Sequence, residues 1–172
     1  MGGEIQVESQ LNCGTTFRIE IEFERVVERA DCKSCVKENA SEESLEGRHF
    51  LLVEDNAINS EILGELLQMR GATYTLRENG LEAVEEFQNS RPGTYDAILM
   101  DIQMPVMNGH EATKEIRKLS RPDAKEIVIV AMTANAFAED VQKAIDVGMD
   151  GHIAKPVDMK LLCNTLSELL PK

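Results

Sequence analysis

The sequence lacks an excess of basic residues, and it lacks any apolar run long enough to cross a bilayer. Its 18 Lys and Arg residues stand against 31 Asp and Glu residues, which gives a formal net charge of -13. A general nucleic-acid-binding protein needs a basic face, so this balance argues against that class. The N-terminus also has no signal-peptide core. We therefore expect a cytoplasmic chain, or the cytoplasmic part of a larger protein that is itself anchored in a membrane.

Cysteines are few, and their spacing gives little support for a metal or redox site. The four are Cys13, Cys32, Cys35 and Cys163. A structural zinc site would need a second pair like Cys32 and Cys35, and the sequence has none. A redox pair normally opens a helix after a strand, whereas this pair lies in a polar, charged stretch. We therefore favour no metal or redox role for Cys32 and Cys35.

The first 47 residues divide into a strand pair and a polar connection. Residues 1–23 alternate between apolar and polar side chains, with a turn signal at Asn12-Cys13-Gly14, which predicts a β-hairpin. A lone hairpin is marginal in water, so we expect it to be disordered, swapped or packed on a neighbour. Residues 24–47 are charged and hold few large apolar side chains, which predicts a flexible linker.

From residue 48 to residue 172 the sequence alternates short apolar runs with amphipathic segments, five times over. Apolar runs that begin near residues 49, 72, 95, 127 and 151 are expected strands. The first helix, after Asn56, is expected to bury Ile58, Ile62, Leu63, Leu66 and Met69. This alternation predicts an α/β fold with a doubly wound, five-stranded parallel sheet, in the strand order 2-1-3-4-5. The hairpin and the linker precede this domain.

Polar side chains stand at the ends of four expected strands. The first strand ends in Glu54 and Asp55, the third in Asp101, the fourth in Thr133 and the fifth in Lys155. In the order 2-1-3-4-5 these strands are neighbours, and the carboxyl ends of parallel strands meet at one crevice where ligands bind. The five side chains should therefore converge.

Each of these residue types suits phosphoryl chemistry. Three close carboxylates repel one another, and Mg²⁺ relieves that repulsion because it prefers carboxylate, carbonyl and water ligands. Lys155 is a point charge suited to a phosphoryl oxygen. The Thr133 hydroxyl and the Ala134 backbone N–H can donate hydrogen bonds to other phosphoryl oxygens. Asp101 can then attack phosphorus and form an acyl phosphate.

These strand ends also carry a family resemblance. Residues 49–170 resemble the receiver (response-regulator) domain of two-component signalling, in a flavodoxin-like fold. The resemblance rests on residues 53–56 (VEDN), 99–109 (LMDIQMPVMNG), 131–134 (AMTA) and 154–156 (AKP). It implies that Asp101 is the phospho-acceptor and that Thr133 and Lys155 contact the phosphoryl group. It also implies that Mg²⁺ is bound by Glu54, Asp55, Asp101 and the main-chain carbonyl of Gln103.

The resemblance further implies a switch and accessory residues. Thr133 would move towards the phosphoryl group, and the residue at the switch position of the fifth strand would follow. That position is usually Tyr or Phe in the family, and here it is His152, which puts an aromatic switch in doubt. Ala134 and Asn135 are accessory positions beside Thr133. A cis peptide bond is a candidate between Lys155 and Pro156.

Residues 2–9 (GGEIQVES) and 14–21 (GTTFRIEI) resemble the closing hairpin of a histidine-kinase ATP-binding domain. A receiver that follows such a hairpin through a linker is the arrangement of a hybrid sensor histidine kinase. The expected partners are the phospho-His donor domain of a kinase and a His-containing phosphotransfer domain. The glycine-rich ATP lid and the phospho-accepting His helix are absent, so this chain should not bind ATP. Whether it counts as an enzyme is left open.

Three alternatives remain. A Mg²⁺-dependent phosphohydrolase with an Asp nucleophile would need an acid two positions after Asp101, where this sequence has Gln103. A pseudo-receiver that serves only as a docking module would not need the complete acidic, hydroxyl and lysine set. An FMN-binding flavodoxin-like domain would need a hydroxyl- and glycine-rich loop after the first strand, where Asp55 lies instead.

Overall fold

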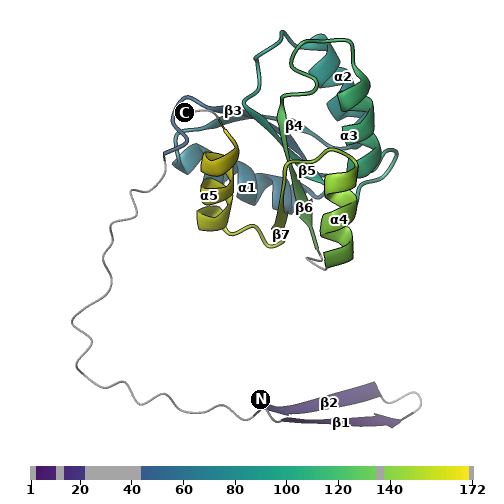
Figure 1. Cartoon of the computed structure of the whole chain (residues 1–172). Helices are drawn as coiled ribbons and strands as arrows, with labels where there is room; N and C mark the ends of the chain where they lie inside the picture. The colour runs from purple at the N-terminus through teal and green to yellow at the C-terminus, as the bar shows by residue number, and fades with distance from the viewer. Residues whose placement is uncertain (1–2, 11–13, 22–43, 135–137, 171–172) are drawn as a thin grey trace, which may run out of the picture. The chain divides into compact units, whose positions relative to one another are not determined.

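The structure is a computed structural model, and it describes residues 3–10, 14–21, 44–134 and 138–170. These residues form two units, a two-stranded hairpin and an α/β domain, and each is described by itself (Figure 1). The sequence positions Asn12, Cys32, Cys35 and Asn135 lie outside the described residues.

The hairpin consists of two antiparallel strands, β1 (Gly3–Gln10) and β2 (Gly14–Ile21). Ile5 is paired with Ile19, and Val7 with Phe17. Ile5, Val7 and Phe17 are largely exposed. The hairpin predicted from the alternating pattern is therefore present, and it carries apolar side chains on its surface.

The α/β domain is built on a five-stranded parallel sheet in the order β4-β3-β5-β6-β7. This is the predicted order 2-1-3-4-5 of the domain's own strands. Their bounds are β3 (His49–Val53), β4 (Thr73–Arg77), β5 (Ala97–Asp101), β6 (Val128–Thr133) and β7 (Gly151–Ala154). Every residue of β5 and β6 is buried, as expected for central strands that are covered on both faces.

Five helices cover the two faces of this sheet (Figure 1). They are α1 (Ala57–Met69), α2 (Gly80–Asn89), α3 (Gly109–Lys118), α4 (Ala138–Asp146) and α5 (Met159–Leu169). Asn56, Asn79, Asn108 and Asp158 cap α1, α2, α3 and α5 by accepting hydrogen bonds from first-turn N–H groups. All four caps lie in the loops that follow β3, β4, β5 and β7, so each of these helices begins after the end of the strand before it.

Two apolar cores lie on the two faces of the sheet. Leu63 and Leu67 of α1 pack with Leu162 and Leu166 of α5 on one face. On the other face the core is made by side chains of α2, α3 and α4, among them Val84, Phe87, Ala112, Ile116 and Ala144. The domain is therefore doubly wound, as predicted.

The predicted buried face of α1 was partly wrong. Ile58, Ile62 and Met69 are 68%, 53% and 80% exposed, whereas Leu63 and Leu67 are buried. The apolar side chains of α1 are spread around more than one face, so their spacing alone did not identify the face that packs on the sheet. This leaves an exposed apolar strip on α1.

The start of the domain includes residues that the sequence placed in the linker. Leu45 is 5% exposed within the α1–α5 core, and its backbone N–H donates to the carbonyl of Arg70. Gly47 donates to Gly71 in the same way. Leu45 is one large apolar residue in a polar stretch, and its burial depends on the distant α1–β4 turn. Composition within a short window could not reveal that contact. The division of the chain into hairpin, linker and receiver stays a prediction.

The loop between β5 and α3 is tightly closed. The Gly109 N–H donates to the Ile102 carbonyl over 3.0 Å, and the Met107 N–H donates to the Pro105 carbonyl over 2.7 Å. The second bond closes a γ-turn around Val106, whose φ is 66°. The loop therefore returns close to the end of β5, where Asp101 lies.

Candidate functional site

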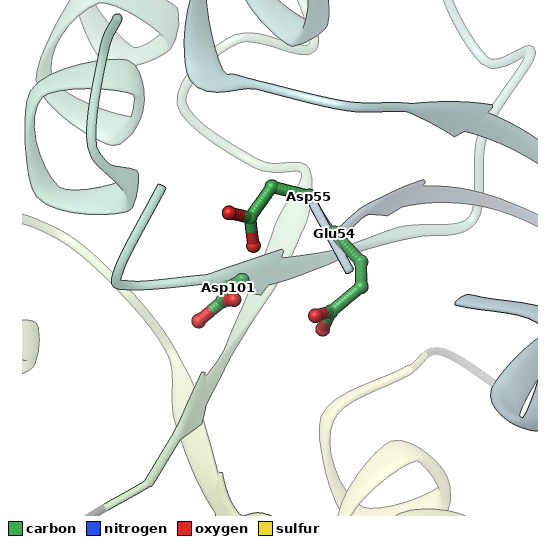
Figure 2. A group of neighbouring side chains, drawn as sticks. All are labelled: Glu54, Asp55 and Asp101. Atoms are coloured by element: carbon green, nitrogen blue, oxygen red, sulfur yellow. The ribbon is translucent and has the colours of Figure 1, made fainter. Parts of the chain in front are cut away.

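Three carboxylates gather where β3 and β5 end (Figure 2). Glu54 and Asp55 follow β3, and Asp101 is the last residue of β5. Ligand oxygens of the three lie within 4.8 Å of one another, and Glu54 and Asp101 are buried while Asp55 is exposed. Neighbouring strands place these residues together because β3 and β5 are paired up to Val53 and Met100. The arrangement is a group of oxygen ligands with one side open to solvent, which suits a hard divalent cation.

Lys155 supplies the positive charge of the site. Its Nζ lies 2.6 Å from Asp101 Oδ2 and 2.5 Å from Glu54 Oε2. The backbone N–H of Lys155 donates to the Thr133 carbonyl over 2.8 Å, which extends the β6–β7 pairing past the end of β7. The peptide bond from Lys155 to Pro156 is cis, as the sequence suggested. The lysine thus bridges two of the three carboxylates.

Burial and charge act in opposite directions on Asp101. Its side chain is 7% exposed, and desolvation raises the pKa of this carboxyl above its ordinary value. The hydrogen bond from Lys155 and the backbone hydrogen bond from Gln103 lower that pKa in part. A cation bound beside Asp101 would therefore stabilise the charged form of this carboxylate.

The other predicted site residues lie on the loop after β5, at the end of β6 and on β7. The Gln103 N–H donates to Asp101 Oδ1 over 3.1 Å, so the loop after β5 folds back over the carboxylate. Thr133 ends β6 and is 7% exposed, and Ala134 beyond it is exposed. His152 is exposed on the edge strand β7, paired in register with Ala131. The structure therefore brings Glu54, Asp55, Asp101, Gln103 and Lys155 together. It places Thr133 at the neighbouring strand end.

One polar contact of the site was missed by the sequence analysis. The Nδ2 of Asn59, in the first turn of α1, donates to Glu54 Oε1 over 3.0 Å. An asparagine five residues after a strand-end glutamate was the available signal, because the helix after such a strand begins beside the strand end. A shallow groove adjoins this contact. Apart from Glu54, Asn59 and Lys155, its lining is apolar, with Ile62, Leu63, Leu66, Pro156 and Val157.

The fold and the site define a doubly wound α/β domain with an acidic, lysine-bridged pocket at the carboxyl ends of its parallel strands. The family model described as the response regulator receiver domain matches residues 50–167. The chain belongs to this family, as the sequence predicted.

Curated relatives include histidine kinases of several organisms. The peroxide stress-activated histidine kinase mak1 of Schizosaccharomyces pombe is 37% identical over 145 residues, which cover 80% of this chain and 9% of the relative. A probable histidine kinase 2 of Oryza sativa is 40% identical over 127 residues, which cover 67% of this chain and 12% of the relative. The chain thus spans only a small part of the length of these relatives.

Solved structures of receiver domains share the fold. The receiver domain of sensor histidine kinase PA1611 from Pseudomonas aeruginosa, crystallised with a magnesium ion in its active site cleft, matches with a TM-score of 0.64 and 36% identity. The match covers 72% of this chain and 97% of that one. The co-crystal structure of the Saccharomyces cerevisiae phosphotransfer protein Ypd1 with the receiver domain of Ssk1 matches with a TM-score of 0.62 and 34% identity. That match covers 71% of this chain and 88% of the other.

The chain therefore contains a receiver domain of phosphotransfer signalling. Among the residues that the structure describes, no helix has the length and apolar character needed to span a membrane.

Proposed function

We propose that this receiver accepts a phosphoryl group on Asp101 and passes it on in a phosphorelay. The observation that carries this proposal is the position of Lys155. Its ammonium group bridges Asp101 and Glu54 at 2.6 and 2.5 Å, in a cluster that also contains Asp55. A cation beside a carboxylate nucleophile can move to a phosphoryl oxygen as charge develops there.

The phosphoryl donor is a phosphohistidine of a kinase domain. An oxygen of Asp101 forms the new P–O bond while the P–N bond to the donor imidazole breaks, and the electron pair stays on the ring nitrogen. The donor leaves as neutral imidazole when its other nitrogen carries a proton. No general base is needed, because a carboxylate is already ionised at neutral pH. Lys155 and the Thr133 hydroxyl donate to the equatorial oxygens, assisted by the Ala134 N–H.

A metal ion fits the residues present. Glu54, Asp55 and Asp101 would provide oxygen ligands, and the Gln103 carbonyl would provide another. Desolvation raises the pKa of Asp101, which favours a bound cation. Mg²⁺, when bound, neutralises charge on the phosphoryl oxygens and on the acidic cluster. The magnesium ion of the PA1611 receiver supports this choice of metal.

Phosphorylation would be transmitted through β6 and β7. Thr133 would move towards the phosphoryl group, and His152 would change its position in response. Thr133 ends β6, and His152 lies on the paired strand β7. The exposure of His152 supports a switch that changes a surface, rather than one that closes over a buried aromatic pocket.

The parent protein is a hybrid sensor histidine kinase, and this receiver is its cytoplasmic relay module. The match with mak1 covers 80% of the chain, a larger share than residues 50–167 make up, so the likeness extends beyond the residues that the family model matches. Residues 1–23 would then be the last hairpin of the ATP-binding domain. The exposure of Ile5, Val7 and Phe17 at 68%, 55% and 67% supports a hairpin that packs against a larger sheet. The downstream partner is a His-containing phosphotransfer domain, a class that Ypd1 represents in its complex with Ssk1.

The alternatives receive less support. A phosphohydrolase would need an acid at position 103, and Gln103 contributes its backbone N–H to Asp101 instead. In a docking module without phosphorylation, a half-buried lysine between two buried carboxylates would cost free energy without serving a function.

Intact-mass spectrometry after incubation with acetyl phosphate and Mg²⁺ tests the proposal. The wild-type chain should gain one phosphoryl group, and Asp101→Asn should gain none. Asp146→Asn, a change at an exposed carboxylate on α4, is the matched control and should behave as wild type. Addition of EDTA before the phosphodonor should abolish the gain. Phosphorylation of Asp101→Asn at the wild-type level would contradict the assignment of Asp101.

A short phosphoryl lifetime could hide the product. Binding of beryllofluoride in the presence of Mg²⁺ covers that case, since it does not depend on turnover. A wild-type chain that neither gains a phosphoryl group nor binds beryllofluoride would overturn the proposed function.

A further inference from the structure

Asn59 lies outside the residues assigned above, yet it contacts one of them directly. Its Nδ2 donates to Glu54 Oε1 over 3.0 Å. The geometry of α1 accounts for this contact. Asn56 caps the helix by accepting from the Ile58 and Asn59 N–H groups, which fixes the first turn. Side chains on a helix lean towards its N-terminus, so the Asn59 amide reaches back to the end of β3.

The two oxygens of Glu54 have different donors. Asn59 donates to Oε1, and Lys155 donates to Oε2 over 2.5 Å. The Glu54 side chain is 2% exposed, so water has little access to replace either donor. Both the position of the carboxylate and its rotation about the last bond are therefore fixed by Asn59 and Lys155.

Loss of the Asn59 donor would change how Lys155 is shared between Glu54 and Asp101. A buried carboxylate oxygen without a hydrogen bond is unfavourable, so Glu54 would turn to bring both oxygens towards the nearest cation. That cation is Lys155, whose Nζ also bonds Asp101 Oδ2 over 2.6 Å. A closer pair of Glu54 and Lys155 would withdraw Glu54 from the cation-binding pocket and Lys155 from Asp101.

We propose that Asn59 is a positioning residue. It keeps the Glu54 carboxylate oriented towards the metal ion and thereby sets the Mg²⁺ affinity of the site. This inference rests on the proposed function, because it assumes that Glu54, Asp55 and Asp101 bind Mg²⁺. Partners that orient metal ligands through hydrogen bonds change metal affinity about 10- to 100-fold when they are removed. Since Asn59 is exposed, we expect a loss of about 10-fold, at the lower end of that range.

The test is a Mg²⁺ titration of the ¹⁵N-labelled chain followed by NMR, without a phosphodonor. The amide of Gln103 is a suitable reporter because it bonds Asp101. Asn59→Ala should raise the dissociation constant about 10-fold, with little change in the midpoint of unfolding. Gln68→Ala, an exposed amide side chain further along α1, is the matched control and should leave the affinity unchanged.

A double-mutant cycle shows whether the effect passes through Glu54. In a Glu54→Ala background, Asn59→Ala should change the Mg²⁺ affinity less than twofold. An equal loss in both backgrounds would overturn the inference, and so would a wild-type affinity in Asn59→Ala. A wild-type chain whose Gln103 amide does not respond to Mg²⁺ would instead refute the proposed metal site, whatever the behaviour of the Asn59 variants.

Discussion

Gly109 lies directly against the main chain of Asp101. A Cβ atom added at Gly109 would lie 2.2 Å from the Asp101 carbonyl oxygen and 3.0 Å from the Ile102 Cα. Both of these are backbone atoms, which cannot move aside without shifting the end of β5. The glycine at the start of α3 is therefore a condition for the position of Asp101.

Substitution of Gly109 should consequently affect both the fold and the site. We expect Gly109→Ala to destabilise the domain by about 2 kcal/mol, a usual cost of overpacking, and to slow phosphorylation by acetyl phosphate. Gly93→Ala is the control. Gly93 has φ of 78° with open space around its Cβ position, so its cost of about 1 kcal/mol comes from the backbone alone. Gly93→Ala should leave phosphorylation unchanged. Equal phosphorylation in Gly109→Ala and wild type would show that Asp101 does not depend on this contact.

Removal of the charge at Asp101 should stabilise the domain when no metal is present. The carboxylate is buried beside Glu54, and desolvation raises its pKa. We expect Asp101→Asn to raise the free energy of unfolding by about 1 kcal/mol, as other substitutions that relieve functional strain do. Urea denaturation at neutral pH with EDTA measures this difference. If Asp101→Asn is less stable than the wild type, the ion pair between Asp101 and Lys155 contributes more free energy than burial of the Asp101 charge costs.

In the presence of Mg²⁺, the wild type should instead be more stable than Asp101→Asn. At a concentration ten times the dissociation constant, a bound ion stabilises the folded state by about 1.4 kcal/mol. The wild type should gain this stabilisation, and Asp101→Asn should gain much less because it lacks one ligand. Thermal unfolding with and without Mg²⁺ measures the gain, and Ca²⁺ in place of Mg²⁺ provides a comparison of ion size. Identical gains in both proteins would place the ion elsewhere.

Lys155 should matter for the phosphoryl group and not for the metal. Loss of one positively charged donor in such a site typically slows the reaction about 100-fold, so we expect Lys155→Ala to accept a phosphoryl group at about that reduced rate. Its Mg²⁺ affinity should be unchanged or higher, because Glu54 and Asp101 lose a competing cation. Lys160→Ala, an exposed lysine in the first turn of α5, should show neither effect. A parallel loss of metal affinity in Lys155→Ala would instead indicate disruption of the site.

Val106 should be replaceable with a gain in stability. It has φ of 66° in a γ-turn and is 79% exposed, and a β-branched residue is strained in that region. We expect Val106→Gly to stabilise the domain by about 0.5–1 kcal/mol, measured by urea denaturation. The phosphorylation rate should stay close to that of the wild type. A loss of stability would indicate that the Val106 side chain makes contacts that outweigh its backbone strain.

Asp123 should give the domain a pH-dependent stability at the end of the sheet away from the site. The side-chain hydrogen bonds from Arg121, at 2.6 and 2.8 Å, lower the pKa of Asp123 below its ordinary value, assisted by the Gly93 N–H. A lowered folded-state pKa means that the unfolded chain binds more protons, so stability rises with pH across this window. The contribution is present above the ordinary pKa and is lost as the pH falls through the lowered one.

We therefore expect Asp123→Asn to be about 1 kcal/mol less stable than wild type at neutral pH. The difference should shrink as the pH falls to about 3. Urea denaturation over that range measures both. A difference that stays constant with pH would assign the effect to packing rather than to the ion pair.

The sequence alone predicted the sheet order and the convergence of the site residues. Parallel strands bring their carboxyl ends to one edge, so Asp101 and Lys155 could be placed together from strand ends alone. The burial of Leu45 could not be predicted in this way, because it depends on a contact with the α1–β4 turn far along the chain. The exposure of Ile58 and Ile62 was missed because helical spacing does not say which of two apolar stripes faces the sheet.

Asn59 shows a different limit of the sequence. Its role depends on the rotation of one amide relative to the end of β3, which a pattern of residue types does not encode. The sequence supported only the general expectation that polar side chains in the first turn of α1 lie near Glu54.

The hydrogen bond between Lys155 and Glu54 joins residues that are 101 positions apart. Lys155 follows β7, the last strand of the sheet, so the bridge can form only after nearly the whole domain has been synthesised and folded. Contacts between residues so far apart in the sequence carry a loop-closure cost and slow folding. A nascent or truncated chain that ends before β7 would still carry the three acidic residues, but not the lysine that we propose speeds phosphoryl transfer to Asp101. Under the proposed function, fast phosphorylation would therefore require the last strand of the sheet to be in place.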